Sequence, residues 1–161
     1  MIFLPRALLK EIVDAAEAAQ PRECCGLLVG HYRPPADLEV TRVVPSPNVV
    51  EVEADKRFEV SPQLRFDLMA ELADGPERVI GLYHSHPGQA AQPSEHDLAV
   101  AWEPDLVWLI TAVMDGQAIH TTAHALDPEG RQFRQVGLRT TDWVPYAVRA
   151  ARGGREDGED D

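Results

Sequence analysis

Residues 78–86 read RVIGLYHSH and are followed directly by Pro87-Gly88. The run is short and largely apolar, and a Pro-Gly pair is a strong signal for the end of a strand. We therefore predict a central β-strand over residues 78–86. Because side chains alternate between the two faces of a strand, His84 and His86 should share one face while Ser85 points to the other.

The segments on both sides of this strand carry helical and extended patterns in turn. We predict helices over residues 5–21, over residues 61–75 after the capping pair Ser61-Pro62, and from Pro93-Ser94 to about Trp102. We predict strands over residues 26–31, 37–44, 106–113, 118–124 and 132–138, with a hairpin turn at Asp115-Gly116. The polar stretch of residues 49–58 is expected to be a loop.

This mixture of helices and strands predicts an α/β fold, with a mixed sheet flanked by helices. The 161 residues fit one domain that is large enough to bury its own core. We expect the domain to span residues 1–138. Residues 139–161 would then form a C-terminal extension, whose acidic end is expected to be disordered.

Composition argues against several classes of protein. The formal net charge is −12, from 15 basic and 27 acidic residues, and such a surface repels nucleic-acid phosphates. The longest apolar run, near residues 106–113, is too short to cross a membrane, and no secretory signal pattern opens the chain. The only cysteines, Cys24 and Cys25, are adjacent and poorly placed for a structural disulfide. We therefore expect a cytoplasmic protein without nucleic-acid or membrane partners.

The paired histidines suggest a metal site. Two imidazoles on one strand face suit a zinc ion, although one could equally pack in the core while the other is solvated. Asp97 lies eleven residues after His86, in the first turn of a predicted helix. A carboxylate there can complete a set of two histidines and one carboxylate, which leaves the fourth coordination position open, as catalytic zinc sites do. Ser94-Glu95-His96-Asp97 also fits a helix capping box, and the two interpretations are compatible.

Glu23 lies between the first predicted helix and the first of the predicted strands. A hydrolytic zinc site needs a nearby carboxylate to move protons, and Glu23 is the candidate, with an exposed loop glutamate as the alternative. A cysteine nucleophile would need an activating histidine, and we expect the two cysteines to be buried instead. The remaining histidines and the two central tryptophans are expected to be surface or packing residues: His31, His96, His120, His124, Trp102 and Trp108.

Together, Glu23, His84-Ser85-His86, Ser94 and Asp97 resemble the pattern of the JAMM (MPN+) metallopeptidases. That pattern is an upstream glutamate, then HxH, seven residues, serine, two residues and aspartate, and every spacing is matched here. The PRECCG sequence of residues 21–26 also resembles the bacterial branch of the family, in which the glutamate lies just before a Cys-Gly pair. The resemblance covers roughly residues 4–126.

The resemblance implies a role for each of these residues. His84, His86 and Asp97 would hold Zn²⁺, Glu23 would be the general base and acid, and Ser94 would donate a hydrogen bond to the developing oxyanion. It also implies an α-β-α sandwich related to cytidine deaminases. The deaminase signature itself, HxE with PCxxC, is missing.

The family resemblance also implies a substrate class. JAMM enzymes cut peptide or isopeptide bonds after the C-terminal Gly-Gly of ubiquitin-like proteins, and small bacterial members resemble enzymes that trim sulfur-carrier proteins. Residues 46–58 are expected to help recognise such a partner. Three alternatives remain: a non-enzymatic MPN scaffold, a DNA-repair-associated JAMM relative, and a cell-wall or phage-tail-associated member of the family. The sequence does not define the oligomeric state.

Overall fold

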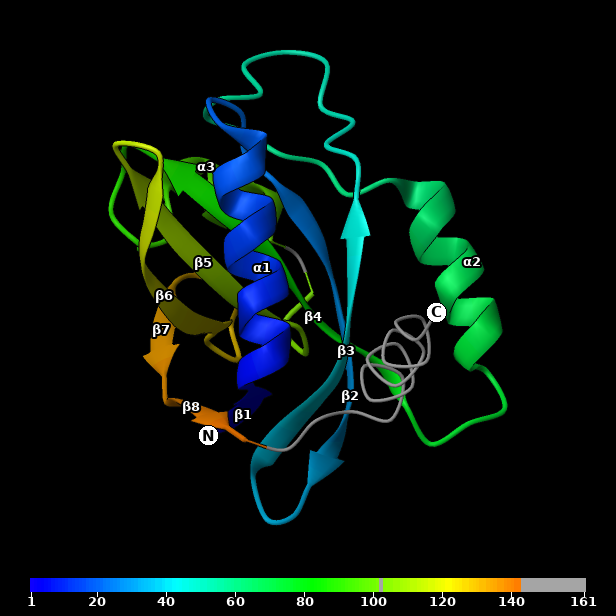
Figure 1. The fold of residues 1–161 in the computed structure, drawn as a ribbon. Helices are drawn as coiled ribbons and strands as arrows, with labels where there is room; N and C mark the ends of the chain where they lie inside the picture. The colour runs from blue at the N-terminus through cyan, green and yellow to red at the C-terminus, as the bar shows by residue number, and fades with distance from the viewer. Residues whose placement is uncertain (102, 143–161) are drawn as a thin grey trace, which may run out of the picture.

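The computed structural model describes residues 1–101 and 103–142. Within them, strands form one sheet in the order β7-β6-β5-β4-β2-β3-β1-β8, with helices packed on both faces (Figure 1). In chain order the elements are β1 (Ile2–Pro5), α1 (Arg6–Ala19), β2 (Cys25–Arg33), β3 (Asp37–Ser46), α2 (Pro62–Leu72), β4 (Arg78–Pro87), α3 (Glu95–Val100), β5 (Val107–Met114), β6 (Gln117–Leu126), β7 (Phe133–Val136) and β8 (Leu138–Thr141).

The sheet is mixed, as predicted. Strand β4 lies in its middle, antiparallel to β2 and parallel to β5, while β1 runs parallel to both β3 and β8. Helices flank the sheet, so the predicted α/β class is confirmed. The more specific relationship to cytidine deaminases stays a prediction.

Most predicted elements are present, with ends that shift by a few residues. Ser61 caps α2 by accepting the backbone N–H of Leu64, and Asp115-Gly116 turns between β5 and β6 with positive φ angles of 51° and 80°. The predicted strand over residues 132–138 is in fact two strands, β7 and β8, which pair with opposite edges of the sheet. Strand β1 was missed because its four residues depend on distant partners, β3 and β8.

The sheet continues past the predicted end of the domain. Strand β8 pairs with β1 and extends the sheet to Thr141, three residues past the predicted domain boundary at residue 138. The expected disorder of the acidic end falls on residues outside the described part of the chain. The same holds for Trp102, which was expected to end the third helix and to lie in the core.

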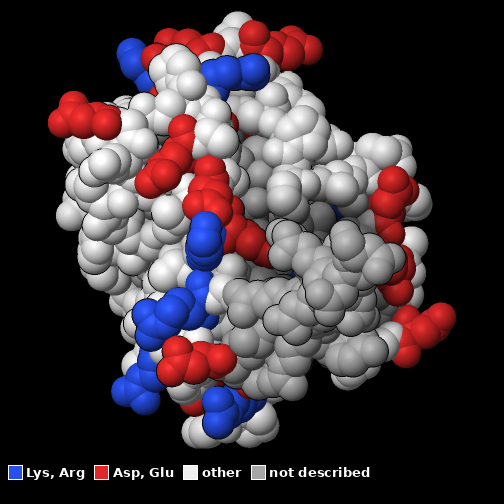
Figure 2. All heavy atoms as spheres, viewed as in Figure 1, with Lys and Arg blue, Asp and Glu red and all other residues white. Residues whose placement is uncertain are grey.

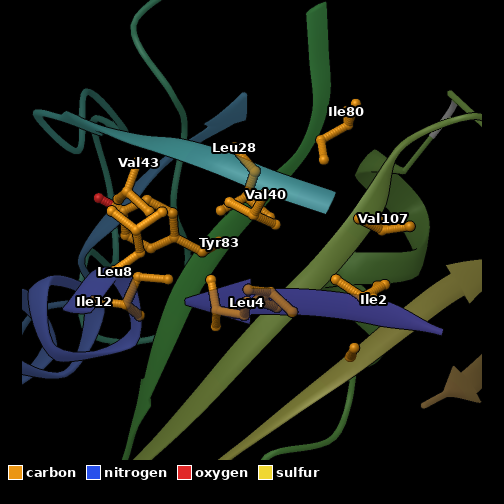
Figure 3. Packing of buried hydrophobic residues seen from close by; sticks show 12 residues of the cluster. Ile2, Leu4, Leu8, Ile12, Leu28, Val40, Val43, Ile80, Tyr83 and Val107 are labelled. Atoms are coloured by element: carbon orange, nitrogen blue, oxygen red, sulfur yellow. The ribbon is translucent and has the colours of Figure 1, made fainter. Parts of the chain in front are cut away.

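Helix α1 covers one face of the sheet. Leu8, Ile12 and Ala16 recur at intervals of four residues and are buried, so one stripe of the helix faces the core. Figure 3 shows Leu8 and Ile12 beside Tyr83 of β4. Burying a leucine or isoleucine in this way stabilises a fold by about 1.5–3 kcal/mol. The buried members of this cluster are Ile2, Leu4, Leu8, Ile12, Leu28, Val40, Val43, Ile80, Tyr83, Val107, Leu109 and Ala123.

The opposite face packs against α2 through a smaller cluster of Leu27, Val29, Val44 and Leu68. Tyr83 points into the α1 cluster, whereas Leu82 packs with the α2 cluster. Continued alternation therefore places His84 and His86 on the α2 face of β4. The strand pairing consequently decides which layer of the protein holds the two histidines.

The surface carries the acidic excess seen in the sequence. Figure 2 shows carboxylate side chains scattered among neutral and basic residues on the face that carries α1, whose Glu11, Asp14 and Glu17 are exposed. In the described residues, none of the helices has both the length and the apolar character needed to cross a membrane.

Gly81 provides a direct test of the close packing between β4 and β5. A Cβ atom at this position would lie 2.4 Å from the carbonyl oxygen of Val107. We predict that Gly81→Ala lowers the free energy of unfolding by about 2 kcal/mol, because the two backbones must move apart. Urea denaturation measures this change.

Gly75→Ala is the matched control, because the nearest atom to its Cβ position is 3.9 Å away. Its free energy of unfolding should stay within about 0.5 kcal/mol of the wild type. Equal destabilisation by the two substitutions would contradict the close approach at Gly81.

Candidate metal centre

Three separate parts of the chain meet at the carboxyl end of β4. Glu23 comes from the connection between α1 and β2, His84 and His86 from the end of β4, and Asp97 from the first turn of α3. All four side chains are at most 2% exposed. Four ionisable groups buried together are unusual, because burying a charge is costly unless it is paired or binds a metal.

Three of these side chains form a small triangle of potential ligand atoms. The Nε2 atoms of His84 and His86 are 3.0 Å apart, and Oδ2 of Asp97 lies 3.2 Å from the first and 3.1 Å from the second. Around a tetrahedral zinc ion with ligands at about 2.0–2.1 Å, neighbouring ligand atoms are about 3.3 Å apart. The observed triangle is therefore close to the size of one face of a zinc coordination tetrahedron.

The hydrogen bonding of His86 supports the same interpretation. Its Nδ1 atom lies 2.9 Å from the carbonyl oxygen of Ala90, so Nδ1 carries the hydrogen and donates. Burial lowers the pKa of His86, but its contacts with Asp97 and with the carbonyl of Ala90 raise the pKa overall. In the metal-free chain a proton on Nε2 therefore joins this atom to the carboxylate of Asp97, and a divalent metal ion would replace that proton. The donor set thus fits a divalent metal ion.

Glu23 lies beside this triangle. Its Oε1 atom is 3.8 Å from Nε2 of His86, and the ligand atoms of Glu23, His84 and His86 all lie within 4.8 Å of one another. Among the described residues, Oε2 of Glu23, Nδ1 of His84 and Oδ1 of Asp97 have no hydrogen-bond partner. Glu23 is thus placed either to bind a metal ion or to act on a molecule bound next to it.

Burial raises the pKa of Glu23 to about 8 in the metal-free chain; His86 opposes this rise, whereas Asp97 and Asp55 add to it. For Asp97, burial alone would raise the pKa, but contacts with the two imidazoles and with the backbone of Ser94 hold the pKa well below its usual range. Burial lowers the pKa of His84. Asp97 is therefore ionised and His84 neutral near pH 7, which are the protonation states that metal ligands require.

Ser94 and Asp97 form the predicted capping box at the start of α3. The backbone N–H of Asp97 donates to Oγ of Ser94 at 3.0 Å, and the backbone N–H of Ser94 donates to Oδ2 of Asp97 at 2.9 Å. The cap therefore holds Oδ2 at the position where it meets the two histidines. Because Ser94 Oγ only accepts in this motif, its hydroxyl hydrogen is free to donate to another group.

Aromatic side chains hold the ring of His84. Phe58 stacks on it, with ring centroids 4.2 Å apart and an angle of 19° between the planes, and Trp108 meets it edge-on at 5.5 Å. Trp108 is buried, as expected for a core residue. The contact made by Phe58 was not predicted. The sequence carries one signal for this contact, a single aromatic residue at the end of the polar stretch of residues 49–58.

A second set of hydrogen bonds supports the loop that follows β4. The hydroxyl of Thr122 donates to the carbonyl oxygen of Ala91 at 2.5 Å, next to the carbonyl of Ala90 that contacts His86. The Nε2 atom of His124 lies 2.7 Å from the same hydroxyl. His124 is buried, so the prediction of a packing role is confirmed. Thr122 was not predicted, because its partner lies in a loop of another part of the sequence.

The cysteines take no visible part in this centre. Both are free; Cys25 is buried and Cys24 is partly buried. Sγ of Cys25 lies 3.8–3.9 Å from the backbone carbonyls of Ser46, Pro47 and Glu59, and burial raises its pKa to about 12. A thiol with this pKa is a poor nucleophile near pH 7.

A groove of about 540 Å³ lies next to the centre. Phe58 and Trp108, which contact the ring of His84, also line this groove. Leu27 and Leu82 line it from the sheet, Val50 and several of residues 57–65 line it from the loop and the start of α2, and His96 and Val100 line it from α3. The groove is lined mainly by apolar side chains, with a bidentate ion pair between Arg65 and Glu103 at its edge.

The chain is similar to known proteins in both sequence and fold. Residues 5–125 match the family described as prokaryotic homologs of the JAB domain. The CysO-cysteine peptidase of Mycobacterium tuberculosis is 27% identical over 111 residues, which cover 67% of this chain and 70% of that protein.

Two solved structures share the fold. Protein DSY2949 from Desulfitobacterium hafniense has a TM-score of 0.76 and 26% identity, covering 89% of this chain and 95% of its own. The JAB1/MPN domain protein AF2198 from Archaeoglobus fulgidus has a TM-score of 0.52 and 22% identity, covering 87% and 97% respectively. This second likeness concerns the fold alone.

The raised pKa of Glu23 gives a testable dependence of stability on pH. Between about pH 4.5 and 8, the unfolded chain loses the Glu23 proton while the folded, metal-free chain keeps it. The free energy of unfolding should therefore fall as pH rises through this window. Glu23→Gln removes the titration, so we predict a melting temperature that exceeds that of the wild type by several degrees at pH 8, with a smaller difference at pH 5.

Thermal unfolding in the presence of a chelator measures this difference. The exposed Glu51→Gln is the control for the loss of one negative charge. A Glu23→Gln advantage that does not change with pH would contradict the raised pKa.

Proposed function

Because the chain belongs to the family of prokaryotic homologs of the JAB domain, we propose that it is a zinc-dependent metallopeptidase that hydrolyses a peptide or isopeptide bond. The observation that carries this proposal is the buried triangle of His84, His86 and Asp97, with the carboxylate of Glu23 beside it. Three protein ligands leave a coordination position open, as catalytic zinc sites require. The pairing of a site of this kind with a neighbouring carboxylate is typical of hydrolytic chemistry.

In this proposal His84, His86 and Asp97 hold the metal, and Glu23 is not a ligand but the general base and acid. A bound zinc ion would supply Lewis acidity, polarising the scissile carbonyl and lowering the pKa of a water molecule. The positive charge would also favour the ionised form of Glu23, opposing the burial that raises its pKa in the metal-free chain.

Glu23 takes a proton from the attacking water and later delivers it to the leaving amine. Its Oε2 atom is buried and has no partner among the described residues, so no other contact competes for it. Ser94 donates its hydroxyl hydrogen to the carbonyl oxygen as negative charge develops there. This contact accelerates the reaction because it is stronger in the transition state than in the bound substrate.

We further propose that the substrate is the C-terminus of a ubiquitin-like or sulfur-carrier protein. The similarity to a CysO-cysteine peptidase supports a small protein conjugate as substrate. The groove of about 540 Å³ next to His84, with walls from residues 50–65, offers a binding surface beside the centre. A cytoplasmic location and the lack of a nucleic-acid partner belong to the same proposal. They agree with the net charge of −12 and the free cysteines.

The main alternative is a non-enzymatic MPN scaffold. The predicted ligands and Glu23 are all present and buried together, which favours an enzyme over a scaffold. The DNA-repair-associated relative is disfavoured by the acidic composition, because a negative surface repels DNA.

We predict that the zinc-loaded protein cleaves a ubiquitin-like or sulfur-carrier protein extended beyond its C-terminal Gly-Gly. Glu23→Gln should lower the rate by about 10²–10⁴-fold because it removes the proton carrier. Ser94→Ala should lower it by about 10²-fold because it removes one donor to the oxyanion. Mass spectrometry of the cleaved products measures both effects.

Both variants should keep the zinc content of the wild type, and the remote, exposed Glu129→Gln should keep wild-type activity. Full activity of Glu23→Gln would contradict the role of Glu23. A zinc-loaded wild type that cleaves none of these substrates would favour the scaffold.

A further inference from the structure

Asn48 is the only asparagine in the sequence, and its amide nitrogen and amide oxygen each make two hydrogen bonds. Its Nδ2 atom donates to the carbonyl oxygen of Glu23 at 3.1 Å and to that of Arg57 at 3.0 Å. Its Oδ1 atom accepts the backbone N–H of Val50 at 3.2 Å and that of Glu59 at 3.0 Å. One side chain thus joins Glu23, two residues before β2, to both ends of the loop of residues 49–59.

The same loop holds Glu23 from its other side. The backbone N–H of Glu23 donates to the carbonyl oxygen of Ala54 at 2.7 Å. Both backbone polar groups of Glu23 are therefore bound by residues 48–54, and neither belongs to a ladder of the sheet. Glu23 lies outside regular secondary structure, between α1 and β2, so these two bonds are what orient its backbone.

The loop also reaches the metal centre and the groove. Phe58, which follows Arg57, stacks on the ring of His84. Arg57, Phe58, Glu59 and Val60 line the groove beside the centre. An isolated antiparallel β-bridge pairs Asn48 with Val60, directly after the loop. Asn48 therefore lies where the backbone of Glu23, the loop and one wall of the groove meet.

We propose that Asn48 is a positioning residue for Glu23, a role in catalysis that rests on the function proposed above. Through its Nδ2 atom it holds the carbonyl of Glu23, and through the loop it holds the N–H of the same residue. The carboxylate of Glu23 is thereby kept beside Nε2 of His86, at 3.8 Å. Asn48 itself touches neither the triangle of ligands nor, in this proposal, the substrate.

Aspartate at this position separates the two halves of the network. A carboxylate still accepts hydrogen bonds from Val50 and Glu59 but cannot donate to the carbonyl of Glu23 or Arg57. Asn48→Asp therefore keeps the bonds from Val50 and Glu59 and breaks those to the carbonyls of Glu23 and Arg57, whereas Asn48→Ala loses all four. Ser46→Ala is the matched control, because it removes two bonds at the base of the loop, from the N–H of Ser61 at 2.9 Å and to the carbonyl oxygen of Pro47 at 2.8 Å, without touching Glu23.

Amide hydrogen exchange followed by NMR tests the proposal without relying on activity. We expect exchange of the Glu23 amide to accelerate at least tenfold in Asn48→Asp and in Asn48→Ala. The amides of Val50 and Glu59 should accelerate only in Asn48→Ala. The amide of Ser85, which donates to the carbonyl oxygen of Cys24, should keep its wild-type rate in every variant. Ser46→Ala should leave Glu23 unchanged.

Steady-state kinetics supplies the second readout. Asn48→Asp should lower kcat at least tenfold with KM within about threefold, at a zinc content equal to that of the wild type. Wild-type exchange at Glu23 in Asn48→Asp would overturn the proposal, as would an unchanged kcat in a variant whose Glu23 exchange has accelerated. An inactive wild type would instead remove the proposed function, and the exchange data alone would then decide whether Asn48 orients Glu23.

Discussion

The convergence of three potential ligand atoms, from His84, His86 and Asp97, is the constraint on which the rest of the structure depends. These atoms lie 3.0–3.2 Å apart in a buried site, where charges are weakly screened. The negative charge of Asp97 has to be balanced there, and in the metal-free chain the imidazole N–H groups balance it, whereas a bound cation would do so in their place. The surrounding structure can be understood as the set of contacts that hold the three atoms together in advance of metal binding.

Each of the three side chains is held in place by different contacts. The alternation of β4 puts both histidines on one face of the sheet, the carbonyl of Ala90 sets the orientation of His86, and Phe58 and Trp108 enclose the ring of His84. The capping box of α3 directs the carboxylate of Asp97. Rigid support of this kind raises metal affinity, because little ordering remains to be done when the ion binds.

The sequence was sufficient to predict what depends on local pattern. Alternation along residues 78–86, the Ser61 cap and the turn at Asp115-Gly116 follow from near neighbours in the chain, and a family motif with intact spacing brought Glu23, His84, His86, Ser94 and Asp97 together. Contacts between distant segments were not predictable in this way. Strand β1 depends on pairing with β3 and β8, Thr122 on a loop from another part of the chain, and Asn48 on its bonds to Glu23, Arg57 and Glu59.

Zinc binding by the purified chain tests the central claim most directly. Elemental analysis after dialysis against buffered zinc should find about one ion per chain in the wild type. His84→Ala and Asp97→Ala should bind little or none, while the exposed His120→Ala should bind as the wild type does. A correctly folded wild type that takes up no zinc, or a His84→Ala variant that binds it fully, would contradict the assignment of His84, His86 and Asp97 as the metal ligands.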